Sequence, residues 1–181
     1  MGVDMHSRVF NVTKNKKNFE DFLLCEEEVY DLMGGICDYV SDDVSLEDDV
    51  YWLLGEDLFK KAKKKHCKEM GIDYYVIPYS VIKEYVKEKK KKKFETIKTA
   101  LKENLKDVLD YYGERKEFTS KNIFSIAMKS FELSDAINSK HSMYIHCEDD
   151  FLTLDKFMIY HLEKMKEGES LYVFQSFDYH F

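Results

Sequence analysis

Residues 3–12 read VDMHSRVFNV, and this stretch decides the fold because the side chains of its two faces differ in polarity. The alternation predicts a β-strand, whose successive side chains point to opposite sides of a sheet. Near the other end of the chain, residues 171–177 read LYVFQSF and predict a second strand in the same way. We expect these two strands to pair, so that one sheet holds both ends of the chain.

Between the two end strands, the spacing of apolar residues predicts mostly helix. Apolar residues recur at intervals of three and four, which is the helical period, in ranges 18–33, 56–70, 79–112, 119–138 and 153–168. Short β-like runs at 74–77 and 143–147 and an irregular acidic stretch at 38–57 separate them. Five consecutive lysines at 89–93 interrupt the longest pattern, so 79–112 is either one helix that projects past the body or two helices.

Length and composition favour one domain over residues 1–181. The chain is 44% hydrophobic and has one proline and seven glycines, which argues against disordered linkers. We therefore predict a helix-rich α+β domain with a small sheet that includes the N- and C-terminal strands.

The expected location is the cytoplasm. No apolar stretch precedes the first strand as a signal peptide would require, and no run reaches the 18 apolar residues of a membrane span. The four cysteines (Cys25, Cys37, Cys67 and Cys147) are too sparse for a disulfide framework, so we expect free, buried thiols.

The charge is arranged in three blocks. Residues 1–59 carry 15 acids and 4 bases, residues 60–130 carry 20 bases and 10 acids, and residues 131–181 carry 10 acids and 4 bases. Single-sign patches steer association with partners of opposite charge. The dense acidic stretch beside the only tryptophan predicts a partner-binding surface for a protein with a basic face. Its candidate residues are Asp42, Asp43, Glu47, Asp48, Asp49 and Trp52.

The basic block gives only a weak indication of a nucleic-acid partner. The lysine run that could touch phosphates is Lys89, Lys90, Lys91, Lys92 and Lys93. The chain has only Arg8 and Arg115 as arginines, although base readers use arginine heavily, and glutamates dilute the lysines. The pattern favours a solvated helix face over a lysine-rich nucleic-acid-binding module.

Catalytic chemistry has one weak candidate. Asp4 and His6 share a face of the first predicted strand, and a carboxylate beside a histidine can orient a general base. The sheet would have to bring His146 or His161 near to complete a small hydrolytic or metal-dependent site. The alternative is a hydrogen-bonded polar patch, and we expect no cofactor because the chain has no phosphate-binding glycine loop and no nucleophile elbow.

A metal site is the other chemical possibility. The dipeptide His-Cys occurs twice, as His66-Cys67 and His146-Cys147, and four such ligands suit tetrahedral zinc. Structural zinc sites favour ligand pairs spaced by two to four residues, and adjacent residues rarely both face one ion. We therefore predict no metal centre.

Both ends of the chain resemble a group of known sequences. The opening MGVDMH is similar to the MG-x-D-M or MG-x-D-I openings of small uncharacterised proteins of phages and prophages, and the closing YVFQSF resembles their YQS-type terminal strand. The resemblance covers the termini alone, and Tyr51-Trp52 is all that corresponds to a Trp-His-Asn-rich middle segment. It implies a phage-linked setting and no particular activity.

Two functions from different classes follow. The favoured one is a non-catalytic binding protein that acts through its acidic surface, and its more specific form is a phage-encoded inhibitor of a host defence complex. The alternative is a small hydrolytic or metal-dependent enzyme that uses Asp4 and His6.

Overall fold

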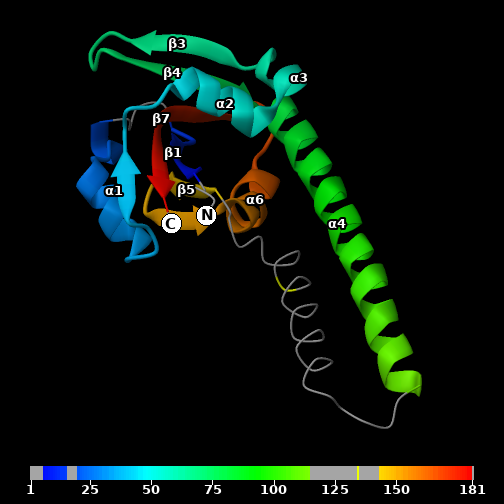
Figure 1. The fold of residues 1–181 in the computed structure, drawn as a ribbon. Helices are drawn as coiled ribbons and strands as arrows, with labels where there is room; N and C mark the ends of the chain where they lie inside the picture. The colour runs from blue at the N-terminus through cyan, green and yellow to red at the C-terminus, as the bar shows by residue number, and fades with distance from the viewer. Residues whose placement is uncertain (1–5, 16–19, 115–133, 135–142, 181) are drawn as a thin grey trace. The chain divides into compact units, whose positions relative to one another are not determined.

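The computed structural model describes residues 6–15, 20–114, 134 and 143–180, and it confirms the α+β class (Figure 1). The chain divides into two compact units, residues 1–86 with 141–181 and residues 87–140. The elements are β1 (His6–Thr13), η2 (Glu20–Phe22), α1 (Glu26–Met33), β2 (Tyr39–Ser41), α2 (Leu46–Leu54), α3 (Glu56–Phe59), β3 (Lys63–Cys67), β4 (Ile72–Pro78), α4 (Tyr79–Glu114), β5 (Tyr144–Cys147), β6 (Asp150–Thr153), α6 (Leu154–Tyr160), η3 (Leu162–Lys164) and β7 (Ser170–His180).

The two ends of the chain pair as expected. β1 runs antiparallel to β7 from His6 opposite His180 to Thr13 opposite Tyr172. The sheet is larger than predicted, with seven strands in the order β3-β4-β7-β1-β5-β6, and β2 pairs with β7 outside this path. β1 and β5 are parallel, so the sheet is mixed.

One irregularity adjusts the pairing of the central strands. Asn11 lies opposite Gln175, whereas Val12 lies opposite Val173, so Phe174 is an extra residue in β7. Such a β-bulge bends its strand and re-aims a side chain. Phe174 is buried against Tyr74, in a small cluster beside β4.

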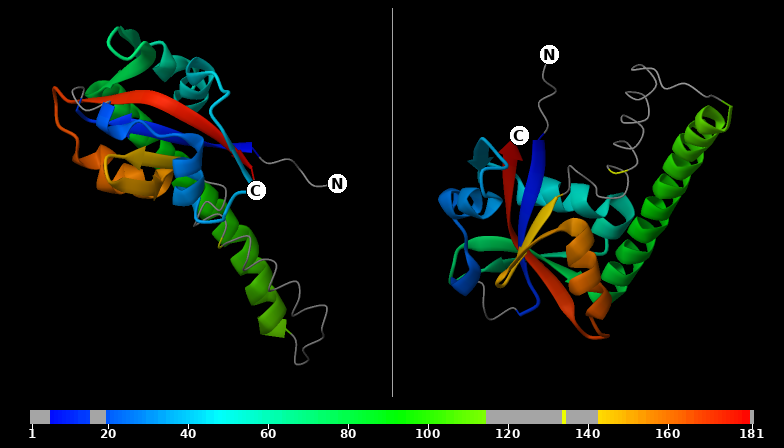
Figure 2. Two further views of the ribbon diagram at one scale, coloured as in Figure 1. Left: turned by 90° about the vertical axis from the view of Figure 1, so that its left-hand side faces the viewer. Right: turned by 90° about the horizontal axis from the view of Figure 1, so that it is seen from below.

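The sheet is covered on both faces. Phe10 and Val173 belong to the larger core, which α2, α3, the first turns of α4 and α6 complete. Val9, next to Phe10, and Phe177, which lies beyond the bulge from Val173, face the other side and pack with Val29 of α1 in a second core. Figure 2 accordingly shows α1 and α6 on different sides of β1 and β7.

The predicted helix at 56–70 is wrong beyond its first turn. α3 ends at Phe59, and Lys63–Cys67 forms β3, which pairs antiparallel with β4. Gly71 has a φ of 66° and lies in the turn of this hairpin, not at a helix end. β3 is an edge strand, where exposed lysines prevent pairing with other chains, so the lysine pattern fits a strand.

Other boundaries also differ from those expected. α1 starts at Glu26 instead of near residue 18, and it ends at Gly34, whose φ of 59° is the left-handed cap conformation predicted there. α6 ends at Tyr160, before the predicted Gly168. β2 and β6 were not predicted, and the helix expected at 119–138 falls almost wholly outside the described residues.

The lysine run does not break the long helix. α4 is one helix from Tyr79 to Glu114, so the pattern at 79–112 does not divide into two helices. Lysine is a good helix former, and an exposed run of five extends a helix without adding to its apolar stripe.

Two isoleucines of the same unit test the core assignment. Ile145 on β5 is 2% exposed and Ile159 on α6 is 56% exposed. We expect Ile145→Ala to lower the free energy of unfolding by about 2–5 kcal/mol through transfer and cavity terms. Ile159→Ala should change it by less than about 0.5 kcal/mol. Urea denaturation of both variants measures the difference, and equal effects would contradict the assignment.

Candidate functional site

The charges of residues 19–59 all have one sign. These residues contain 14 aspartates and glutamates and no lysine, arginine or histidine. Part of this density has a local cause, because α1 begins with Glu26, Glu27 and Glu28, and α2 also begins with three acids. Carboxylates at a helix N-terminus interact favourably with the helix dipole.

The acids of α1 border an open depression between α1 and β2, which we call the acidic hollow. It has a volume of about 450 Å³, and it is lined by Glu26, Glu27, Tyr30, Asp31, Asp38, Tyr39 and Val40. Tyr30 is 44% exposed and Tyr39 is 52% exposed. The hollow therefore combines four carboxylates with two accessible aromatic rings.

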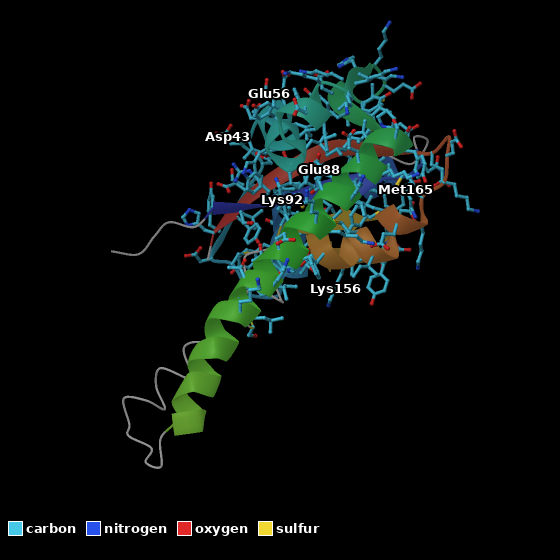
Figure 3. The ribbon with its side chains drawn as sticks, turned by 90° about the vertical axis from the view of Figure 1, so that its right-hand side faces the viewer. Asp43, Glu56, Glu88, Lys92, Lys156 and Met165 are labelled. Atoms are coloured by element: carbon cyan, nitrogen blue, oxygen red, sulfur yellow. The ribbon has the colours of Figure 1, made fainter. Side chains whose placement is uncertain are left out.

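A hydrogen bond connects the hollow to the next part of the acidic segment. The Asp42 backbone N–H donates to Glu26 Oε1 at 2.8 Å. Asp42 and Asp43 are exposed in the turn that leads to α2, so the carboxylates of this turn continue the surface of the hollow. Figure 3 shows the labelled Asp43 and Glu56 at the two ends of the α2 region.

The exposed side of α2 carries Trp52 of the predicted site and its neighbour Tyr51. Trp52 is 53% exposed and Tyr51 is 46% exposed. Tyr51 stacks edge-on against Phe59 with the ring centroids 5.4 Å apart, which fixes its position. Asp48 is exposed on the first turn of this helix, where its N–H donates to Ser45 Oγ at 3.2 Å.

Glu47 is on the surface but is already engaged. Its Oε2 accepts a hydrogen bond from Lys64 Nζ at 3.0 Å, and this contact lowers the pKa of the Glu47 carboxyl. Lys64 also lies 3.2 Å from Asp73 Oδ2, and His66 Nδ1 lies 2.8 Å from Asp73 Oδ1. This group of four side chains ties α2 to the β3–β4 hairpin.

Asp49 does not belong to the exposed surface, and its assignment to the partner-binding set is corrected. Asp49 is 5% exposed, and its Oδ1 accepts a hydrogen bond from Arg8 Nε at 2.7 Å. Arg8 also pairs with Asp178 of β7. Asp49 therefore holds α2 on the central strands, because a buried carboxylate needs a charged partner.

Sequence reasoning missed the hollow itself. Tyr30 falls within the longer helix predicted at 18–33, whereas the observed α1 is shorter and buries only Val29 and Met33. The two buried positions are four residues apart, and the acids Glu27 and Asp31 have the same spacing on an exposed face. The spacing of these two acids could have indicated an exposed acidic face on α1.

The proposed catalytic group is not assembled among the described residues. Asp4 lies outside them, and His6 is described only as a residue of β1 opposite His180. His146 is buried with its Nδ1 2.9 Å from Asn11 Oδ1. His161 instead pairs with Asp150, with 2.9 Å between Nε2 and Oδ2.

The two His-Cys pairs do not meet. Four strand steps separate β3 from β5 in the sheet, which corresponds to about 19 Å. Burial raises the pKa of the Cys147 thiol to about 12, so this thiol is protonated at neutral pH and is a poor ligand and nucleophile. All four cysteines are free, and Cys25 is exposed, contrary to the expected burial. Among the described residues, no three His, Cys, Asp or Glu side chains are placed to hold a metal ion.

The remaining predicted site, Lys89 to Lys93, lies within α4. Its middle residues are exposed, while Lys89 and Lys93 are partly buried. Exposed lysines in an unbroken helix are compatible with a solvated face, and the exposed ring next to the run, Phe94, has Lys98 Nζ 6.0 Å from its centroid. In the described part of the chain, no helix has the length and apolarity to cross a membrane.

The buried role of Asp49 gives a test with a neighbouring control. Asp49→Asn keeps the shape but removes the charge that Arg8 contacts, so we expect a loss of about 2–3 kcal/mol in the free energy of unfolding. Asp48→Asn, at the exposed neighbour, should change it by less than about 0.5 kcal/mol. Thermal or urea unfolding compares the two, and similar losses would show that Asp49 is not a structural residue.

Comparisons with known proteins identify no relative: no family model, no curated protein and no solved structure matches the chain.

Proposed function

We propose that the protein is a non-catalytic binding protein that recognises a basic protein surface through its acidic segment. The observation that carries this proposal is that four carboxylates and two exposed aromatic rings line the hollow together. Aromatic residues are enriched at protein interfaces, and complementary charge increases the rate and selectivity of association. Exposed rings in an acidic surface therefore suit a partner that supplies cations.

The hollow suits an arginine or lysine side chain of the partner. Tyr30 and Tyr39 offer ring faces for cation–π contact, and Glu27, Asp31 and Asp38 offer carboxylates for charge-assisted hydrogen bonds. Arginine uses both kinds of contact at once, because its guanidinium is planar and presents five donors. Trp52 on α2 is a further exposed aromatic ring of the acidic segment, although it does not line the hollow.

The same surface argues against a nucleic-acid partner at this site. Carboxylates repel phosphates, and the affinity of nucleic-acid-binding proteins comes largely from lysine and arginine contacts to phosphate. The acidic segment has none of these bases. The phage-like ends of the chain support the more specific proposal that the partner is a component of a host defence complex.

Two double variants with equal net charge test the proposal. Glu27→Lys with Asp31→Lys places bases in the hollow, whereas Glu69→Lys with Glu167→Lys changes exposed acids elsewhere. Each pair raises the formal net charge from −7 to −3. The measurement is the Kd for the protein partner that the wild-type chain recovers by affinity purification from a bacterial lysate.

The hollow variant should weaken binding by at least about tenfold, because two attractive charges become repulsive, and the control variant should weaken it by less than about twofold. Affinity should also fall as salt is raised from 50 to 300 mM, roughly as expected for contacts between exposed charges. Equal affinity of the two variants, or recovery of nucleic acid as the sole stoichiometric partner, would refute the proposed site.

A further inference from the structure

A buried chain of polar side chains holds the segment before α1 against the sheet. Gln175 of β7 forms two hydrogen bonds with the backbone of Leu24: the Leu24 N–H donates to Oε1 at 3.0 Å, and Nε2 donates to the Leu24 carbonyl at 3.0 Å. Asn11 of β1 is fully buried, and its Nδ2 donates to Gln175 Oε1 at 2.8 Å and to the Phe22 carbonyl at 2.5 Å. Side chains of two central strands, β1 and β7, thus hold residues 22–24 by hydrogen bonds to their backbone.

These contacts determine the protonation state of the next group, His146 of β5. The Phe22 carbonyl only accepts hydrogen bonds, so the atom of Asn11 that faces it is the amide nitrogen, and the other atom, Oδ1, is an acceptor. His146 Nδ1 lies 2.9 Å from this oxygen and must therefore carry a proton. The neutral imidazole then has a bare Nε2.

The surroundings of His146 favour the neutral ring. The side chain is 8% exposed, and burial lowers the pKa of His146, although the carboxylates of Asp149 in the β5–β6 turn and Glu28 of α1 oppose this effect. Asn11 on β1 is uncharged. Glu28 is not free to move toward a charged His146 ring, because its Oε2 accepts the Cys25 N–H at 2.8 Å and caps α1.

We propose that His146, Asn11 and Gln175 form a pH-sensitive latch that fastens residues 22–24, and with them the start of α1, to the sheet. A second proton on His146 would place a charge in the buried chain. Opening of residues 22–24 exposes that charge to water, so protonation favours the open state. This inference is independent of the proposed binding function, although α1 also borders the acidic hollow.

The direction of the effect follows from the two pKa values of the histidine. In the closed state the pKa of His146 lies below its ordinary value of about 6.5, whereas in the open state it returns to that value. The open form therefore binds the proton more tightly. The latch is strongest above about pH 6.5 and weakens as the pH falls through the closed-state pKa.

Amide hydrogen exchange at Leu24 measures the latch directly. After correction for the intrinsic exchange rate, we expect the protection of this amide to fall about fivefold or more from pH 7.5 to pH 5. His146→Gln keeps an amide donor for Asn11 but does not titrate, so its Leu24 protection should change less than about twofold. His66→Gln, at an exposed histidine, should behave like the wild-type chain.

A second measurement covers the case in which His146→Gln does not fold. In NMR spectra of the wild-type chain, the imidazole resonances of His146 and the amide resonance of Leu24 should titrate with one common midpoint below pH 6.5. Different midpoints, or protection of Leu24 that does not change with pH, would overturn the proposal. Loss of protection in His146→Gln equal to that of the wild-type chain would assign the effect to another group, such as Glu28, and would overturn it equally.

Discussion

The pairing of β1 with β7 is the constraint on which the rest of the sheet depends. It joins residues from 159 (Thr13 and Tyr172) to 174 (His6 and His180) positions apart, so its formation requires the closure of nearly the whole chain. The other strands build outward from this pair: β5 adds to β1, β4 and β2 add to β7, and β3 and β6 follow on β4 and β5. The register of this pairing specifies which face of the sheet each side chain takes. A shift of the register by one residue would move Phe10 and Val173 out of the larger core.

Arg8 connects this pair to the acidic segment. Its guanidinium lies between Asp49 of α2 and Asp178 of β7, so one cation on β1 neutralises carboxylates from two other elements. The acidic segment supplies no base of its own, and its buried acid must therefore be matched by a charge from outside. Lys64 does the same for Glu47 at the surface. Around α1, Glu26 and Glu28 accept the backbone N–H groups of Asp42 and Cys25, whereas Glu27 and Asp31 lie on the exposed side of the helix.

The parts predicted from sequence are those with a local signal. The alternation of the end strands and the glycine after Met33 act over a few residues, and both were assigned correctly. β3 was missed because a lysine-rich strand shows no alternation, and only its pairing with β4 determines its conformation. The acidic hollow was also missed, because α1 and β2 contribute to it from separate stretches of sequence. The burial of Asp49 likewise depends on a distant residue, since Arg8 of β1 pairs with it.

The charge of α1 is not explained by the stability of the helix. Acids in the first turn are favourable, but Glu27 and Asp31 form a like-charge pair at a spacing of four, which is unfavourable by a few tenths of a kcal/mol in a helix of only eight residues. Local conflicts of this kind are concentrated at functional sites. A cation held between these carboxylates would attract both of them. Part of the affinity for a basic partner would therefore come from removing the repulsion between Glu27 and Asp31 that destabilises the free protein.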